Sequence, residues 1–179
     1  AGFQYKEDAE RYYVSLKERL KKFNLELEDS KSRKIEFGKY AEINSKRKYG
    51  RKAETFNFLG FTLYCGKSRH SGEFCVKLKT NSKKFTQKLK QTKEWLYQNN
   101  DLPVKDLITR LNKKLVGHYR YYGVSHNINK LSAFLHYVQR YLFKVLNRRS
   151  HKKSYTWDGY IDMLKVYPLA KPKIYVKLF

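Results

Sequence analysis

Acidic residues are scarce in this chain, and its charges are strongly unbalanced. The 179 residues include 40 Lys and Arg against 16 Asp and Glu, which gives a formal net charge of +24. A small domain needs a net charge of only roughly 2 to 8 in magnitude to stay soluble, so solubility does not account for this excess. A field of this sign and size favours a polyanionic partner, and nucleic acid is the leading one.

Long apolar runs and cysteines are scarce too. No stretch approaches the roughly 20 apolar residues of a membrane-spanning helix, and the N-terminus resembles no signal peptide, so no membrane partner is expected. With only Cys65 and Cys75 the chain has no disulfide framework, which favours a reducing, cytoplasmic setting. Together with His70 they supply three potential zinc ligands, one fewer than a closed structural site needs. Unpaired strand cysteines and no metal site are therefore expected.

Aromatic residues, in contrast, are abundant. They make up 16% of the chain, which argues against a disordered basic tail because disordered segments are poor in aromatics. Periodicity and turn residues predict an α+β fold. The elements expected in the N-terminal part are a helix over residues 7–23 that ends at Asn24, short strands over 25–27 and 33–37 around a turn at 28–31, a basic loop over 39–52, and a hairpin of residues 56–65 and 73–79.

From Asn81 onward strand signals disappear, and three helices are expected. Pro103 stands at the start of the second helix and Gly123 follows its last periodic residue, the positions where these residues are favoured. A short fourth helix is expected over residues 157–166, before Pro168 and Pro172. The three apolar stripes are Phe85, Leu89 and Leu96; Val104, Leu107, Ile108, Leu111, Leu115, Tyr119 and Tyr122; and Leu131, Phe134, Leu135, Val138, Leu142 and Leu146.

Three segments carry a resemblance to a known family. The aromatic segment FNFLGF at residues 56–61 has a glycine where a ligand or another backbone could approach closely. It lies between a DSKS turn at residues 29–32 and a basic helix that contains GHYRYYG at 117–123. Residues 24–38, 55–61 and 81–123 together resemble, in order, the last palm motifs and the maturase-specific thumb of group II intron-encoded reverse transcriptases.

The resemblance implies an architecture as well. It implies an α+β fold in which a partial reverse-transcriptase palm, residues 1–80, ends with a primer-grip hairpin. An α-helical thumb bundle, the maturase-specific domain, would occupy residues 81–150, and residues 151–179 would form a short C-terminal extension. A bacterial, cytoplasmic setting accords with this family.

The acidic residues do not provide the metal site of a polymerase. Polymerase chemistry needs carboxylates gathered around Mg²⁺, and this chain has no adjacent Asp pair. The family places its Asp-Asp pair just upstream of a stretch like residues 1–4, so the chain is expected to be a fragment that lacks it. Mg²⁺ is then expected in the full-length parent and no cofactor in this chain, which should not polymerise alone. Its aspartates are scattered, at Asp8, Asp29, Asp101, Asp106, Asp158 and Asp162.

Candidate site residues come from both the basic helix faces and the resemblance. Lys31 matches the lysine of the late palm motif, a possible nucleotide or leaving-group contact; Phe58, Leu59, Gly60 and Phe61 match the primer grip. The tyrosines of 117–123 cannot all face inward, so at least one should be free to stack on an unpaired base. A basic run at 147–154 is a further candidate RNA contact. The expected RNA-binding residues are Lys83, Lys84, Lys88, Arg110, Lys113, Lys114, His118, Tyr119, Arg120, Tyr122, Arg140, Lys144, Arg148 and Arg149.

The expected function is therefore binding of intron RNA and of an RNA/DNA template–primer duplex. The resemblance implies that the parent performs RNA-directed DNA synthesis and assists splicing, and that the missing N-terminal palm and fingers of the same enzyme are a partner of this chain. Two alternatives stay open: a non-catalytic RNA-binding splicing factor derived from such an enzyme, and a defence-associated reverse transcriptase. The sequence upstream would decide between an enzyme and a splicing factor.

Overall fold

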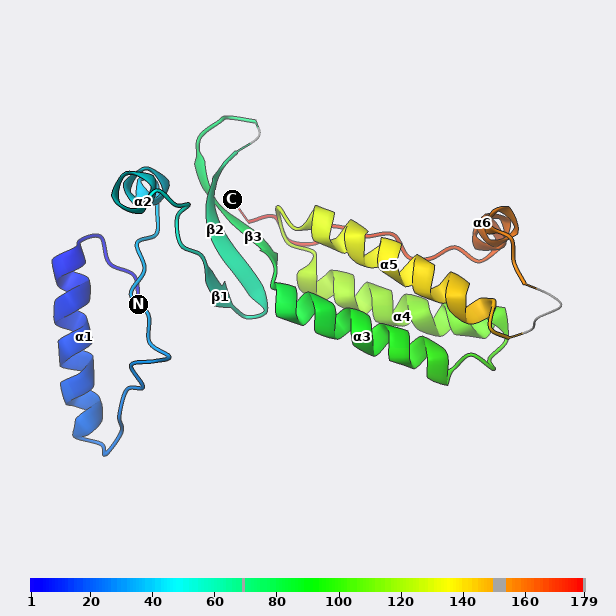
Figure 1. Cartoon of the computed structure of the whole chain (residues 1–179), viewed down its shortest axis with the longest axis horizontal. Coiled ribbons are helices and arrows are strands. Elements are labelled where there is room, and N and C mark those ends of the chain that lie inside the picture. The colour runs from blue at the N-terminus through cyan, green and yellow to red at the C-terminus, as the bar shows by residue number, and fades with distance from the viewer. Residues whose placement is uncertain (69, 150–153, 179) are drawn as a thin grey trace. The chain divides into compact units, whose positions relative to one another are not determined.

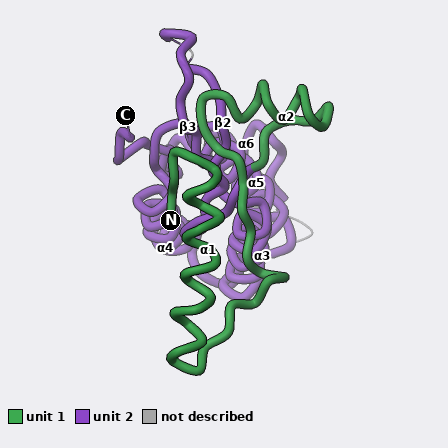
Figure 2. Tube along the Cα trace, turned by 90° about the vertical axis from the view of Figure 1, so that its left-hand side faces the viewer, with its two compact units in different colours: residues 1–54 green, residues 55–179 purple. Residues whose placement is uncertain are grey.

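A computed structural model describes residues 1–68, 70–149 and 154–178. It divides the chain into two compact units, Ala1–Glu54 and Thr55–Phe179 (Figure 2). The described residues contain helices and one three-stranded sheet, so the predicted α+β class is confirmed. The palm and thumb assignments within it stay predictions.

The first unit begins with helix α1, Lys6–Lys21, which confirms the helix predicted at residues 7–23. Glu7 and Asp8 lie in its first turn and Arg19 and Lys21 in its last, the arrangement that a helix dipole favours. Asn24 follows with a φ of 55°, a left-handed conformation that asparagine tolerates and that ends helices. The predicted stop at Asn24 is therefore confirmed.

Two predictions for this unit are wrong. The strands expected at residues 25–27 and 33–37 do not form, and only the turn between them is present, closed by the Lys31 N–H on the Glu28 carbonyl. An isolated pair of such short strands has too little cross-strand contact to be stable. The basic loop expected at 39–52 contains helix α2, Ala41–Tyr49.

Helix α2 forms because its end groups favour it. Gly50, at a φ of 63°, donates its N–H to the Lys46 carbonyl and so caps the C-terminus. Glu42 lies in the first turn and three cations in the last, which complements the helix dipole. Buried Ser45 donates its hydroxyl to the Lys52 carbonyl. The basic composition alone suggested a loop, but these capping contacts make a helix.

The second unit starts with an antiparallel sheet in the order β1-β2-β3 (Figure 1). The strands are β1, Phe56–Phe58; β2, Phe61–Lys67; and β3, Phe74–Thr80. The predicted pairing of the second and third strands is confirmed. The single strand expected over 56–65 is instead broken by a two-residue turn at Leu59 and Gly60, whose φ angles are 46° and 78°. Two positive φ angles are typical of the turns that suit the twist of a hairpin.

The four predicted helices are all present (Figure 1). They are α3, Ser82–Gln98; α4, Val104–Tyr122; α5, Ile128–Leu146; and α6, Trp157–Val166. Pro103 is the N-cap of α4 and Gly123 its C-cap, as expected. None of the described helices is long and apolar enough to span a membrane.

The core of the second unit is made by the predicted apolar stripes. Leu96, Leu111 and Val138, from three different helices, are almost completely buried. Phe61 of the sheet joins this cluster, as do residues of α6 and Leu169 beyond it. The sheet therefore packs with the helices in one compact unit. The compact units divide between residues 54 and 55, a different place from the family domain boundary expected at residue 80. That domain boundary stays a prediction.

A buried asparagine joins the sheet to the helices. Asn127 has no exposed surface, and its Oδ1 accepts a hydrogen bond of 2.8 Å from the Thr80 N–H at the end of β3. Its Nδ2 donates to the Thr80 hydroxyl and to the Tyr122 carbonyl at the end of α4, both at 2.8 Å. Three chain ends, those of β3 and α4 and the start of α5, are thus held by one side chain.

The C-terminal tail is also bound to the end of α4. The N–H groups of Tyr175 and Val176 both bond to the Gly123 carbonyl, and Val176 forms a parallel bridge with Val124. A Cβ at residue 123 would lie 2.3 Å from the Tyr119 carbonyl oxygen and 2.6 Å from that of Lys173. Glycine is required here because both neighbours are backbone atoms that cannot move independently.

We expect Asn127→Ala to destabilise the second unit by about 2 to 4 kcal/mol, because the buried Thr80 N–H and Tyr122 carbonyl would each lose a partner. Urea unfolding monitored by circular dichroism measures this loss. Asn129→Ala, at an exposed position two residues further along, is the control and should stay within about 0.5 kcal/mol of the wild type. Equal stabilities of the two variants would contradict the structural role of Asn127.

Candidate nucleic-acid interface

The β1–β2 turn lies where the predicted primer-grip residues are, and two hydrogen bonds hold it against the helices. The Asn81 N–H, just before α3, donates to the Gly60 carbonyl at 2.9 Å. The Tyr121 hydroxyl, near the end of α4, donates to the Leu59 carbonyl at 3.1 Å. A Cβ on Gly60 would lie 3.1 Å from the Tyr122 hydroxyl oxygen, so the turn approaches α4 closely. The position of this turn is therefore tied to the helical bundle.

The four residues of the predicted primer grip differ in exposure. Phe58 and Leu59 are 62% and 66% exposed. Phe61 is buried, with its ring centroid 5.3 Å from that of Tyr122 and 6.1 Å from that of Tyr121. Phe58 and Leu59 are thus available to a ligand, whereas Phe61 packs in the core. The assignment of residues 58–61 to a primer grip stays a prediction.

A groove of about 700 Å³ opens beside this turn. We call it the first groove. Three lysines that the sequence predicted as RNA contacts, Lys84 and Lys88 of α3 and Lys114 of α4, line it together with the turn. The complete lining is Leu59, Gly60, Lys84, Gln87, Lys88, Thr92, Lys114, Gly117, His118, Tyr121, Tyr122 and Phe134.

A second groove, of about 500 Å³, also borders α4. Two further predicted contacts, Lys113 and Arg120, line it, and Gly117 lines both grooves. The other residues of the second groove are Thr109, Asn112 and Val116.

The cations of the two grooves are not neutralised by neighbours. Among the described residues, no ion pair involves Lys84, Lys88, Lys113, Lys114 or Arg120. All five are exposed. Unpaired cations that border a groove attract an anionic ligand.

His118 lines the first groove, and the surroundings of its imidazole are unusual. Its ring stacks on Phe134 with centroids 3.9 Å apart, and its Nε2 is buried without a hydrogen-bond partner among the described residues. Burial, assisted by the charge of Lys88, lowers the pKa of His118 to about 4. The imidazole is therefore neutral near pH 7. It therefore contributes no positive charge to the first groove.

Two tyrosines predicted to contact RNA, Tyr119 and Tyr122, are buried, although Tyr122 still lines the first groove. Tyr119 has no exposed surface and Tyr122 is 5% exposed, since both continue the apolar stripe of α4 into the core. Burial raises the pKa of both phenols. The expectation that one tyrosine of the 117–123 segment is free for stacking is met by Tyr121, which is 56% exposed. Its helical phase, one position off the stripe, was the signal that could have singled it out.

The remaining predicted contacts lie outside the grooves. Lys83, Arg110, Arg140 and Lys144 are exposed. Arg148 is exposed as well, with its guanidinium carbon 5.2 Å from the centroid of the Tyr97 ring. Arg149 is half-buried, and burial lowers the pKa of its guanidinium. Residues 150–153 of the basic run at 147–154 lie outside the described residues.

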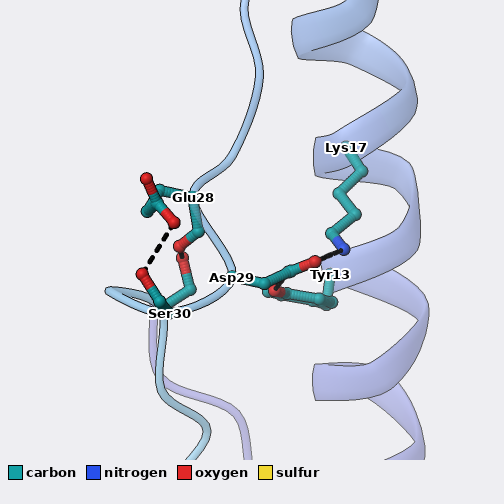
Figure 3. A network of polar contacts seen from close by, with 6 residues as sticks. Tyr13, Lys17, Glu28, Asp29 and Ser30 are labelled. Carbon is teal, nitrogen blue, oxygen red and sulfur yellow. Dashed lines mark hydrogen bonds and ion pairs between the residues drawn. The ribbon is translucent and has the colours of Figure 1, made fainter.

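Lys31, in the first unit, is exposed and has its Nζ 3.9 Å from Glu28. The adjacent Asp29 accepts hydrogen bonds from Lys17 and Tyr13 of α1 (Figure 3). These bonds, that of Lys17 first, lower the pKa of the Asp29 carboxyl. Asp29 therefore attaches the 28–31 turn to α1. The proposed nucleotide contact of Lys31 stays a prediction.

The carboxylates do not fit a Mg²⁺ site. Across residues 1–68, 70–149 and 154–178, no three His, Cys, Asp or Glu side chains converge. Cys65 and Cys75 are free thiols on β2 and β3. No catalytic step is therefore derived from these residues.

The low pKa of His118 predicts how stability depends on pH. Unfolded His118 would take up a proton below about pH 6.5, whereas the folded side chain does so only near pH 4. The free energy of unfolding should therefore fall as the pH drops, by about 2 kcal/mol between pH 7 and pH 5 from this residue. His118→Phe should reduce this loss in chemical unfolding experiments, because phenylalanine does not titrate.

His136→Phe, at an exposed position in α5, is the matched control and should keep the pH dependence of the wild type. A His118→Phe variant with an unchanged pH dependence would show that the imidazole is not buried in its neutral form.

The helices that border the two grooves match a known protein family. Residues 82–160 match the family of the group II intron maturase-specific domain. The match spans α3, α4, α5 and the start of α6. No curated protein and no solved structure matches the chain. Residues 82–160 are therefore similar to the maturase-specific domain of group II introns, in agreement with the resemblance seen in the sequence.

Proposed function

We propose that the second unit binds intron RNA and a template–primer duplex through the first groove. The observation that carries this proposal is the convergence of Lys84, Lys88 and Lys114 on a groove next to the β1–β2 turn. Two helices and a hairpin turn contribute to it, so the cations are brought together by the fold and not by sequence alone. The maturase-specific domain makes intron RNA the expected ligand.

The chemistry of the groove suits a nucleic acid. Lysines without anionic partners bind phosphates and release counterions, a sequence-independent contribution that falls with salt. Tyr121, exposed at the edge of the groove, offers a ring on which an unpaired base could stack. Positive charge and a stacking surface are thus available within one groove.

The β1–β2 turn supports the more specific role of primer binding. Its backbone is fixed to α3 and α4 by the hydrogen bonds of Asn81 and Tyr121, and its tip exposes Phe58 and Leu59. A primer end held there would contact the turn and the lysines together. We propose that the parent protein uses this arrangement in RNA-directed DNA synthesis and in assisting splicing, with its Mg²⁺ ligands supplied from outside the described residues.

Replacement of Lys84, Lys88 and Lys114 together by alanine should weaken RNA binding and reduce the magnitude of the log–log salt slope by about two, because three phosphate contacts are lost. Fluorescence anisotropy of a labelled structured RNA over a salt series measures both quantities. The thermal transition should move little, since exposed substitutions change stability by about 0.5 kcal/mol or less. The contact of Lys114 with the Trp95 ring, 4.9 Å away, would add about 0.5 to 1 kcal/mol to that loss.

The matched control replaces three exposed lysines after α6, Lys171, Lys173 and Lys177, by alanine. Both triple variants lose the same net charge, so a difference between them reports the location of the contacts. Equal weakening by the two triple variants would refute the groove as the binding site. A flat salt response of the wild type would refute electrostatic RNA binding altogether.

A further inference from the structure

Gly117 lies in α4, and no packing contact of the described residues explains why this position is a glycine. It lies in the interior of a helix of 19 residues, where glycine costs about 1 kcal/mol relative to alanine. A Cβ added to it would meet no atom within 4 Å. Gly60 and Gly123, in contrast, have close neighbours at the position of a Cβ. Neither packing nor a left-handed backbone within the described residues requires a glycine at position 117.

The surface around Gly117 is basic. On a helix, residues three and four positions away are the immediate neighbours. For Gly117 these are Lys113, Lys114, Arg120 and Tyr121, all of them exposed. A bare patch of helix backbone is thus surrounded by three cations and one accessible aromatic ring.

Gly117 also connects the two grooves. It is the residue that lines both of them, with Lys114, His118 and Tyr121 on the side of the first groove and Lys113 and Arg120 on the side of the second. A ligand that extends from one groove into the other passes over α4 at Gly117. A side chain there would stand in its path, because none of the described residues covers this position.

We propose that the sugar–phosphate backbone of a bound RNA strand crosses α4 at Gly117. The missing side chain lets the strand lie directly on the helix, where Lys113, Lys114 and Arg120 can contact its phosphates from both sides. Phosphate oxygens are the usual partners of exposed Lys and Arg in nucleic-acid complexes. A protein helix seated on Gly117 would instead bring its own surface against three unpaired cations. This inference rests on the proposed function and adds the path of the strand to it.

The experiment compares Gly117→Ala and Gly117→Leu with the wild-type chain. Binding of a labelled RNA duplex with a single-stranded overhang is measured by fluorescence anisotropy over a salt series, and stability by thermal unfolding. Gly117→Ala should weaken binding by roughly tenfold, which corresponds to about 1.4 kcal/mol, and Gly117→Leu should weaken it further. The salt slope should stay close to that of the wild type because all the cations remain. Both variants should melt at a higher temperature than the wild type, because either residue favours a helix more than glycine does.

A higher melting temperature together with weaker RNA binding would distinguish the strand crossing from a structural role of Gly117. Ser132→Ala, at an exposed position of α5 outside both grooves, is the control that raises helix propensity and should leave binding unchanged. If the wild type binds with a steep salt dependence and both Gly117 variants bind equally well, the crossing is refuted and the proposed function stands. If the wild type shows no salt-dependent binding, the proposed function itself fails.

Discussion

The arrangement of the second unit depends on the hydrogen bonds of one buried amide, that of Asn127. It holds the last residue of β3 to the end of α4 and the start of α5. Since Thr80 is followed directly by Asn81, the same junction fixes the start of α3 and, through the Asn81 N–H, the β1–β2 turn. An unpaired polar group in this dry environment would be costly, so the three partners of Asn127 must stay together. The first groove exists because the sheet is attached to the helices at this point.

Helix α4 connects the core to the proposed RNA surface. One face carries Leu111 and Tyr119 into the interior, and the other presents Gly117 with its cationic neighbours to the solvent. Tyr121 lies between these roles: its ring contacts Phe61, and its hydroxyl holds the Leu59 carbonyl of the turn. A change in the turn is therefore expected to affect α4, and a change in α4 to affect the turn. A primer end at the turn and an RNA strand on α4 would be positioned by a single rigid element.

Much of the fold could be predicted where local signals were strong. The apolar stripes of α3, α4 and α5 predicted the helices and most of the core, because an apolar period of 3.6 residues that continues over several turns is typical of an amphipathic helix. The prediction failed where a few capping contacts decide the structure. Residues 39–52 looked like a loop by composition, yet Gly50 and Ser45 stabilise α2. At residues 25–37 the short apolar segments lack the neighbouring strands that would make a sheet.

The sequence by itself determined the helical phase, and with it the side of each helix that carries lysine and arginine. It also determined the excess of positive charge. Only the tertiary structure decided which cations share a groove, because Lys84 and Lys88 of α3 and Lys114 of α4 come from two helices whose separation is set by packing. It likewise decided that His118 is buried and neutral and that Tyr121, not Tyr119 or Tyr122, is accessible. Burial depends on the neighbours a side chain meets in space, and no local pattern contains that information.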